Sequence, residues 1–393
     1  MLDQGIKNAP YGRIFLREVI ALFKKLGFGT MRLPLLNADD TKSIDIEQFK
    51  KMADMFIERG FCYFDTAYPY HGECSENALK KAVIERYPRE KLIIADKMPI
   101  LRVQATADYQ KYFDEQIKRC GTDYFDFYLL HNMGRDRYIK TQRYGGFEFI
   151  SALKKKGDVR KIGFSFHDDA DTLDRILSEH PEVDFVQLQI NYLDWDGAVA
   201  QSGRCYNVAK KHNKEVLVME PVKGGTLANL PDKAMQLFNG FYGENAPTPA
   251  SLAVRYAASL ENVKIVLSGM SNIAQLENNT SYMQDFKPLT DGERELVKNI
   301  TSVLKSTIKV QCTGCRYCLE ECPKNINIPD YFGLLNLHAV TGKKTNMYYE
   351  RFSMNYAKAS ECLKCGRCEN ICPQHIDIRK YLEEFAALYE ENA

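Results

Sequence analysis

The chain has 393 residues, which is enough for two or three domains of ordinary size, and its 45% hydrophobic and 27% charged residues are typical of a folded globular protein. This composition excludes a disordered or collagen-like chain. The 53 Lys and Arg residues balance the 52 Asp and Glu residues to a formal net charge of +1, so the overall charge attracts neither nucleic acid nor an anionic membrane.

Residues 1–24 are predicted to form an N-terminal extension. Its apolar stretch at 14–23 is interrupted by Arg17 and Glu18, and no cleavage site of small residues follows it, so we predict no secretory signal and expect a cytoplasmic location. No apolar run in the chain reaches the roughly 20 residues that a membrane-spanning helix needs. We therefore expect no membrane partner and no nucleic-acid partner.

From residue 25 to about residue 281, short β-branched or aromatic runs alternate with amphipathic helical stretches, which is the pattern of repeated βα units. A helix is expected to begin near Ser75, for example, because apolar residues then recur at helical spacing. Eight strands are predicted, at residues 26–30, 61–66, 91–97, 124–131, 161–166, 183–190, 215–220 and 264–269. Eight units favour a closed (β/α)8 TIM barrel over residues 25–309, since an open doubly wound sheet more often has about five to seven strands.

The pattern changes after residue 291. Residues 293–307 predict a helix that leads the chain away from the barrel, and residues 310–393 predict a small, mostly α-helical second domain. Eight of the twelve cysteines fall in two tight groups within this region, and such grouping indicates metal ligands rather than disulfides.

Both cysteine groups have the spacing C-x2-C-x2-C-x3-C-P, which is typical of ferredoxins with two [4Fe-4S] clusters, where the fourth cysteine of each run binds the other cluster. We therefore predict two clusters. Their ligands are Cys312, Cys315 and Cys318 with Cys372, and Cys362, Cys365 and Cys368 with Cys322. Two structural zinc sites are the alternative, although zinc sites seldom repeat the C-x3-C-P step. The 39 residues between the groups exceed the spacer of small β-sheet ferredoxins, so the region resembles the α-helical ferredoxin type.

Polar residues close three neighbouring predicted strands. Asp65, Lys97 and His131 end the second, third and fourth strands, and Tyr70 follows in the loop after Asp65. Each alone could be structural, as a buried ion pair, a packed tyrosine or a core histidine. Together they lie at the strand ends where barrel enzymes hold catalytic groups. An ammonium near a phenol favours the phenolate, which brings a proton donor of ordinary pKa about 10 towards working pH.

Six segments around these residues resemble the aldo-keto reductase family, and the resemblance spans residues 26–281. They are GFGTMRLP (27–34), FDTAYPYHGECSENAL (64–79), ADKMP (95–99), YLLHNM (128–133), KIGFSFHD (161–168) and MEPVKGG (219–225). The resemblance implies a catalytic tetrad of Asp65, Tyr70, Lys97 and His131. In it Tyr70 is the acid/base, Lys97 lowers the pKa of that phenol, Asp65 holds Lys97, and His131 orients the substrate carbonyl. Tyr68 is the rival phenol, but the family's five-residue step from the aspartate favours Tyr70.

The resemblance also implies a nicotinamide cofactor. By this resemblance Ser165 and Gln187 contact the nicotinamide carboxamide, and Met219 packs against the nicotinamide ring. The pyrophosphate lies along Pro221, Gly224 and Gly225, and the adenosine end is held by Ser271, Gln275, Asn278 and Asn279. Phe166 stands where many members have asparagine. The loop that begins at residue 268 has no Lys or Arg to clamp a 2′-phosphate, so NADP and NAD both remain open.

These features predict an oxidoreductase that exchanges hydride between a nicotinamide and a small carbonyl or alcohol substrate. One alternative is an electron-transfer protein, in which the clusters carry single electrons to or from a redox protein partner and the barrel is a docking or sensing platform. Another is that the clusters only brace the C-terminal fold. The sequence supplies no flavin motif that would split a hydride into single electrons.

Overall fold

The computed structural model describes residues 24–38, 40–197, 200–306, 309–310, 312, 317–372 and 376–390. The predicted extension, except Lys24, and the predicted ligand Cys315 lie outside these described residues. Eight parallel strands close into one barrel in sequence order, which confirms the predicted (β/α)8 architecture. The strands are β1 Leu26–Gly29, β2 Tyr63–Asp65, β3 Ile93–Met98, β4 Phe125–Met133, β5 Val159–Phe166, β6 Phe185–Gln189, β7 Glu215–Met219 and β8 Val263–Gly269.

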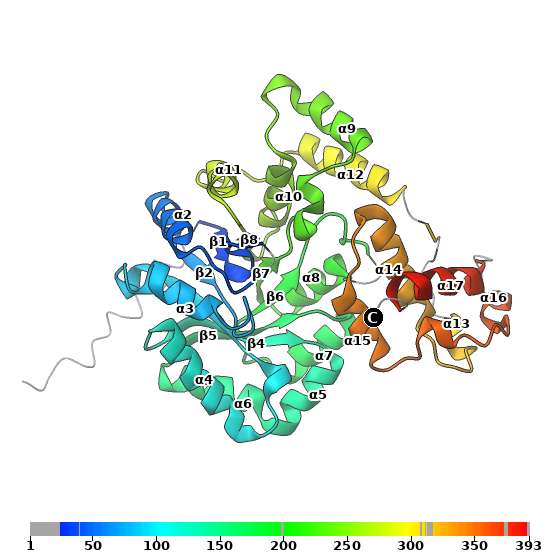
Figure 1. Ribbon diagram of the computed structural model, residues 1–393, viewed down its shortest axis with the longest axis horizontal. Helices are drawn as coiled ribbons and strands as arrows, with labels where there is room; N and C mark the ends of the chain where they lie inside the picture. Colours follow the sequence, from blue (N-terminus) through cyan, green and yellow to red (C-terminus); the bar gives the residue numbers. More distant parts are fainter. Residues whose placement is uncertain are drawn as a thin grey trace, which may run out of the picture.

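Helices surround the barrel, as Figure 1 shows. They are α2 Ile46–Glu58, α3 Ser75–Leu79, α4 Thr106–Cys120, α5 Arg135–Tyr144, α6 Gly146–Lys156, α7 Ala170–Glu179, α8 Ser202–Lys211, α9 Asp232–Tyr242, α10 Pro249–Ala258, α11 Ile273–Met283 and α12 Asp291–Lys305. Short helical turns join them: η1 Thr30–Arg32, η2 Lys80–Ile84, η3 Arg89–Lys91, η4 Ile100–Arg102, η5 Lys223–Ala228 and η6 Gly243–Asn245. Several helices begin at a residue that sequence rules favour. Thr290 and Glu293, for example, form a capping box at the start of α12.

The strands separate two apolar cores, because successive side chains point to opposite faces of a strand. Outward residues such as Phe64 and Tyr128 pack against the helices. Inward residues fill the barrel interior. This inner core consists of Tyr63, Ile93, Ala95, Phe127, Leu129, Phe185, Leu217, Ile265 and Leu267. It is a solid apolar layer, and the next inward positions along the strands lie at their carboxyl ends.

The C-terminal region is helical, as predicted. Its elements are α13 Tyr317–Glu320, α14 Ile328–Thr341, α15 Asn346–Ser353, η7 Ala359–Glu361, α16 Arg367–Asn370 and α17 Ile378–Tyr389. An aromatic core holds them together, in which the rings of Tyr331 and Tyr389 each stack on Phe385 with centroids 4.6 Å apart. Among the described residues, no helix has the length and apolar character to cross a bilayer.

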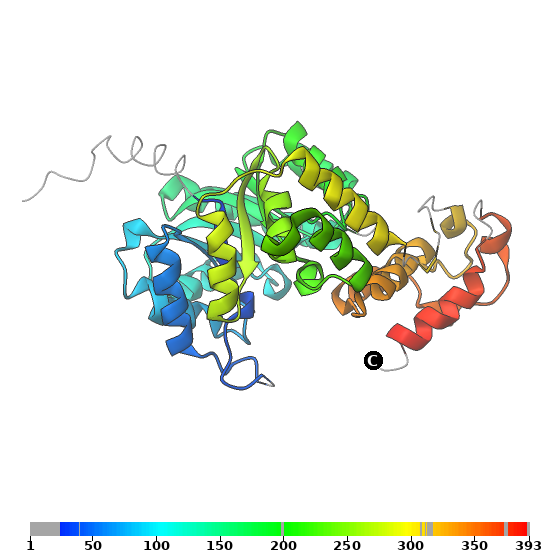
Figure 2. The ribbon, with the colours of Figure 1, turned by 90° about the horizontal axis from the view of Figure 1, so that it is seen from above.

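Helices α14 and α15 lie between the barrel and the remaining C-terminal helices in both views (Figures 1 and 2). Among the described residues, hydrogen bonds join this region to the segment after β7, to the end of β6 and to the start of α5. Lys343 donates to the carbonyl of Gly224 at 3.0 Å, Tyr348 to Gln189 at 2.5 Å, and Asn355 to Asp136 at 2.9 Å. The C-terminal region therefore covers part of the barrel end that holds the predicted active site.

Candidate active site

The carboxyl ends of β2, β3 and β4 direct three polar side chains into the barrel. Each lies two residues beyond a member of the inner core: Asp65 after Tyr63, Lys97 after Ala95, and His131 after Leu129. Strand periodicity therefore places all three in one layer above the apolar interior. Asp65 and Lys97 are almost completely enclosed, at 3% and 1% exposure.

An ion pair forms the base of this layer. Nζ of Lys97 lies 2.5 Å from Oδ1 of Asp65 and donates to the carbonyl of Thr66 at 2.7 Å. The amide of Gln187 donates to the other Asp65 oxygen at 3.2 Å. Burial lowers the pKa of Lys97, but the charges of Asp65 and Tyr70 outweigh it and leave that pKa above its ordinary value. The ammonium is therefore protonated and held in one place.

Tyr70 and His131 lie next to this ammonium. Nζ of Lys97 is 4.9 Å from the centre of the Tyr70 ring, and the rings of Tyr70 and His131 meet nearly at right angles with centroids 6.0 Å apart. The backbone amides of Glu73 and Ser75 donate to the carbonyl of Tyr70, which fixes the loop that carries it. The structure thus brings all four predicted tetrad residues together.

Burial decides the protonation of both rings. It raises the pKa of the Tyr70 phenol above its ordinary value; the charge of Lys97 acts in the opposite, predicted direction but does not overcome burial. Burial and the charge of Lys97 hold the pKa of His131 well below its usual range. At neutral pH Tyr70 is a protonated acid and His131 a neutral imidazole. This protonation suits a proton donor beside a hydrogen-bonding group.

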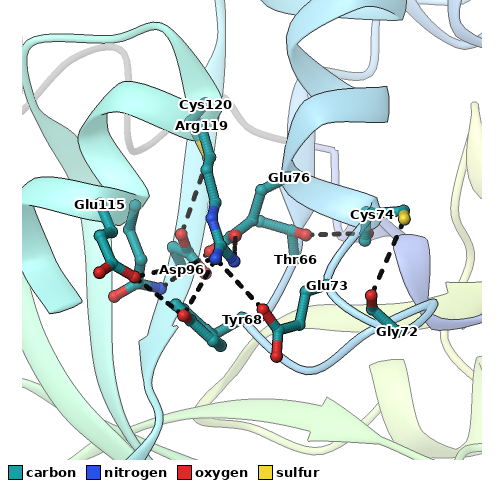
Figure 3. Close-up of polar contacts among 12 residues, drawn as sticks. Thr66, Tyr68, Gly72, Glu73, Cys74, Glu76, Asp96, Glu115, Arg119 and Cys120 are labelled. Carbon is teal, nitrogen blue, oxygen red and sulfur yellow. Dashed lines mark hydrogen bonds and ion pairs between the residues drawn. The ribbon is translucent and has the colours of Figure 1, made fainter.

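The rival phenol is held elsewhere. Figure 3 shows Tyr68 turned towards Glu115 and Arg119, to which its hydroxyl is bonded at 2.8 Å and 3.0 Å. Burial and the hydrogen bond to Glu115 raise the pKa of Tyr68 to about 12. Tyr68 therefore belongs to an ionic cluster on α4, whereas Tyr70 faces Lys97 and His131.

This ionic cluster supports Lys97 from behind and was not anticipated from the sequence. Glu76 and Asp96 are both fully buried, and burial together with the charge of Glu76 holds the pKa of Asp96 well above its usual range. Asp96 accepts the backbone N–H of Lys97 at 2.8 Å, and Gln116 donates to Glu76 and to the carbonyl of Lys97. Figure 3 shows Arg119 reaching into the same cluster. The end of β3 is thus fixed by polar contacts.

The positions predicted to contact a nicotinamide occupy the same inward layer. Ser165 and Gln187 lie opposite each other on β5 and β6 and are 1% and 2% exposed. Met219 ends β7 in register with Gln189. The hydroxyl oxygen of Ser165 accepts the backbone N–H of Asn132 at 2.8 Å. These side chains are adjacent to the tetrad, because Gln187 is bonded directly to Asp65.

The loop after β7, at Gly224 and Gly225, is the predicted phosphate cradle. Lys223, Gly224 and Gly225 have positive φ values of 47°, 59° and 97°. The N–H groups of Lys223 and Gly225 donate to the carbonyls of Glu220 and Val222 within the loop. Nothing lies within 4 Å of a Cβ built on Gly225, so there is room beside that backbone. Pro221, before the cradle, is buried. Lys223 itself is bonded to both oxygens of Asp194 at 2.6 and 2.7 Å, and its charge is neutralised there.

The residues predicted for the adenosine end differ in availability. Ser271 and Gln275 are exposed at the start of α11, and the backbone N–H of Ser271 donates to Gln275. Asn278 accepts a hydrogen bond from Thr248. Asn279 is 7% exposed and uses both ends of its amide internally, donating to Ser268 and accepting from Tyr282.

Arg32 is a basic residue that the sequence interpretation missed. Its side chain lies against Gly269 at the end of β8, and its guanidinium is 3.6 Å from a Cβ built on Gly224. The hydroxyl of Ser271 donates to the carbonyl of Arg32 at 2.9 Å. Arg32 therefore spans the loops after β7 and β8. Arg32 lies within the segment GFGTMRLP, which the sequence analysis had matched to the family. That segment does not show which residues Arg32 contacts in space.

Four predicted cluster ligands meet in the C-terminal region. Cys322, Cys362, Cys365 and Cys368 line one cavity. Among the described residues, no three ligating side chains converge closely enough for a single metal ion. Four cysteines around one cavity match the predicted ligand set of one [4Fe-4S] cluster, in which each thiol binds a different iron. Cys312, Cys318 and Cys372 of the other set belong to the same core, and their predicted companion Cys315 lies outside the described residues.

Two family models match separate parts of the chain. Residues 25–302, more than two thirds of the chain, match the aldo/keto reductase family. The chain belongs to the aldo/keto reductase family. Residues 311–377 match a 4Fe-4S dicluster domain, so this aldo/keto reductase carries an iron-sulfur domain, as the motifs predicted.

Individual relatives agree with this assignment. The chain is 27% identical over 279 residues to an aldo-keto reductase of Mycobacterium avium, covering 67% of this chain and 89% of the relative. A holo aldo-keto reductase from Bacillus halodurans has a TM-score of 0.54 and 24% identity, covering 70% of this chain and 91% of its own. An aldo-keto reductase from Klebsiella pneumoniae in complex with NADPH has a TM-score of 0.55 and 17% identity, covering 71% and 91%. At these identities the solved structures show the shared barrel fold.

Proposed function

We propose that this aldo/keto reductase uses NADP or NAD to reduce a small carbonyl compound, or to oxidise the corresponding alcohol, with Tyr70 as the acid/base. The observation that supports this most directly is the convergence of Tyr70, His131 and the Asp65–Lys97 pair in one enclosed layer. Three of these groups lie on neighbouring strands and Tyr70 lies in the loop after β2, and a phenol placed beside an ammonium and an imidazole can transfer a proton to a carbonyl oxygen.

The residues fit a nicotinamide cofactor. Ser165 and Gln187 would hold its carboxamide and Met219 would pack on its ring. The cradle at Gly224 and Gly225, with its open side, would hold the pyrophosphate. When bound, the nicotinamide supplies the hydride to the carbonyl carbon or accepts it from the alcohol.

Tyr70 completes the reduction. As negative charge develops on the carbonyl oxygen, the phenol donates its proton to that oxygen, and the product is a neutral alcohol. Lys97 stabilises the phenolate left behind, and Asp65 holds Lys97 in position. His131, neutral because its pKa is held low, donates a hydrogen bond that orients the carbonyl. The reverse sequence oxidises an alcohol.

We propose two [4Fe-4S] clusters with the ligand sets predicted above; the cavity lined by Cys322, Cys362, Cys365 and Cys368 supports one of the two. Cys365 is exposed, and Leu363 on the rim of the cavity is 59% exposed, so a cluster held there would lie near the surface. This position would allow electron exchange with a redox protein partner. Free thiols that ligate iron suit the reducing cytoplasm.

The test of the tetrad is Tyr70→Phe, which removes only the hydroxyl. We expect kcat for carbonyl reduction to fall about 10² to 10⁴-fold while nucleotide binding stays nearly unchanged. Tyr68→Phe is the matched control, since Tyr68 lies two residues away and faces α4. If Tyr70→Phe reduces a carbonyl at near wild-type rate, with a deuterated cofactor showing that hydride transfer limits the rate, the tetrad assignment is wrong. The electron-transfer alternative would then be favoured.

A further inference from the structure

Two arginines lie at the mouth of the barrel beside the catalytic layer, one from each part of the chain. Arg137, on α5, is tied to the end of β4. Its Nε donates to the carbonyl of Asn132 and its Nη2 donates to the Asn132 side chain at 3.0 Å. Because Asn132 directly follows His131, the guanidinium of Arg137 is held close to the predicted substrate-orienting imidazole.

Arg351, on α15, is brought to the same place by the C-terminal region. Tyr348 bonds to Gln189 at the end of β6, and Asn355 bonds to Asp136 at the start of α5, so the segment between them crosses the mouth. Arg351 lies within this segment. Its guanidinium is 5.0 Å from the centre of the Tyr348 ring and 4.5 Å from that of Phe352.

Among the described residues, no carboxylate forms an ion pair with Arg137 or Arg351, and Nη1 of Arg351 is buried without a hydrogen-bond partner. The carboxylates that act on the charge of Arg137 are Asp136 and Asp168. Asp136 accepts from Asn355, and the two oxygens of Asp168 accept backbone N–H groups.

The hydrogen bonds of Arg137 to Asn132 and of Asn355 to Asp136 bring the two arginines to the same side of the barrel. Burial and the charge of Arg351 lower the pKa of Arg137. Burial and the charges of both arginines lower the pKa of His167 to about 3, and Nδ1 of His167 is also buried without a partner among the described residues. Partly buried cations without an ion-pair partner destabilise a site, and an oxyanion placed between the two arginines would relieve that cost.

A small hollow, with room for about one water molecule, lies beside Tyr348 of α15 and the ends of β5 and β6. His167, Gln189 and Tyr348 are among its lining residues. Arg351 adjoins it, because its guanidinium is 5.0 Å from the centre of the Tyr348 ring, whereas Arg137 is not among the lining residues. The cofactor phosphates are expected at the loops after β7 and β8, so an anion bound here would belong to the substrate.

We propose that Arg137 and Arg351 form an oxyanion-binding subsite that selects carbonyl substrates carrying a carboxylate or phosphate group. Guanidinium groups bind both of these anions through paired, charge-assisted hydrogen bonds. The inference rests on the proposed reductase function and adds the substrate class. It also gives the iron-sulfur domain a direct part in substrate recognition, because it supplies Arg351.

The test compares matched substrates on the anaerobically purified full chain. The carboxylate pair is 4-carboxybenzaldehyde and 4-methylbenzaldehyde, and the phosphate pair is glyceraldehyde 3-phosphate and glyceraldehyde. For Arg351→Gln we expect kcat/KM to fall about 10 to 100-fold for the charged member of at least one pair, mainly through KM, and less than about threefold for the neutral member. The pair that responds identifies the anion. Arg294→Gln, which removes an exposed guanidinium from α12, is the control.

Equal losses of kcat/KM for charged and neutral substrates would show that Arg351 only supports the fold. No loss for either substrate would show that Arg351 does not bind the substrate. Both results overturn the proposal.

A second measurement needs no turnover. Inorganic phosphate or benzoate should protect Arg137 and Arg351 from modification by phenylglyoxal, measured by peptide mass spectrometry. Protection without carbonyl turnover would refute the proposed function and keep the subsite. Carbonyl turnover without protection of the arginines and without a preference for charged substrates would refute the subsite and keep the proposed function.

Discussion

The Asp65–Lys97 pair allows a quantitative test of how the catalytic layer is held. Asp65→Asn keeps the shape of the side chain but removes the charge that faces an ammonium only 1% exposed. Breaking one side of a buried pair costs about 3 to 5 kcal/mol. Because Lys97 keeps its hydrogen bond to the Thr66 carbonyl, we expect the lower end, about 3 kcal/mol in the free energy of unfolding.

The pair should also be strongly coupled. Lys97→Met leaves the buried Asp65 carboxylate without its cation, which should cost a similar amount. In the double variant Asp65→Asn/Lys97→Met no charge remains buried, and its stability should lie within about 1 kcal/mol of the wild type. Urea unfolding followed by the fluorescence of Trp195, the single tryptophan, measures all four proteins. Additive losses in the double variant would refute the reasoning, whereas kcat should be low in all three variants.

Four further outcomes are expected. In nucleotide titrations, Arg32→Ala should raise the Kd for NADPH about tenfold or more relative to the Kd for NADH, because a guanidinium beside Gly224 can reach a 2′-phosphate. Equal changes in the two Kd values would show that Arg32 does not bind the 2′-phosphate. Anaerobic protein should contain about eight irons and eight acid-labile sulfides, and zinc in their place would contradict this. The pKa of Tyr70 is raised, so the phenol should remain a proton donor and kcat for reduction should stay constant from about pH 7 to 9. The rate should fall only as the pH rises through that higher pKa. A fall in kcat centred below about pH 9 would argue against Tyr70 as the acid. Glu293 is paired with Arg255, and its pKa is lowered from 4.5 to about 2. Its contribution to stability is therefore complete above pH 4.5 and is lost as the pH falls towards 2. In unfolding experiments, Glu293→Gln should lack this acid-dependent loss of stability.

The barrel could be predicted because its signals are local. Each strand is a short apolar run, and a period of two decides which residues face inwards, so Asp65, Lys97 and His131 could be assigned to one layer before their distances were known. Strand ends were less accurate. β4 continues to Met133 because the residues after His131 still pair with β5, and β2 is only Tyr63–Asp65.

Long-range contacts could not be predicted from local patterns. Gln189 and Tyr348 are 159 residues apart, and no periodicity shows that α15 lies across the end of β6. No local pattern around Arg32 or Arg351 indicates which distant segments each residue lies against. The pKa of Tyr70 was predicted to fall because Lys97 is near, and it rises because enclosure outweighs that charge, which a linear pattern cannot show.

The hydrogen bonds from Lys343, Tyr348 and Asn355 to the barrel limit how far the two parts of this protein can be separated. A barrel expressed alone would lose these three hydrogen bonds and would uncover Gln189 at the end of β6, to which Tyr348 of α15 is bonded. The iron-sulfur region is thus a structural component of the reductase and not a separable domain. Changes in its sequence would be constrained by the shape of the substrate entrance as well as by the needs of its cysteines.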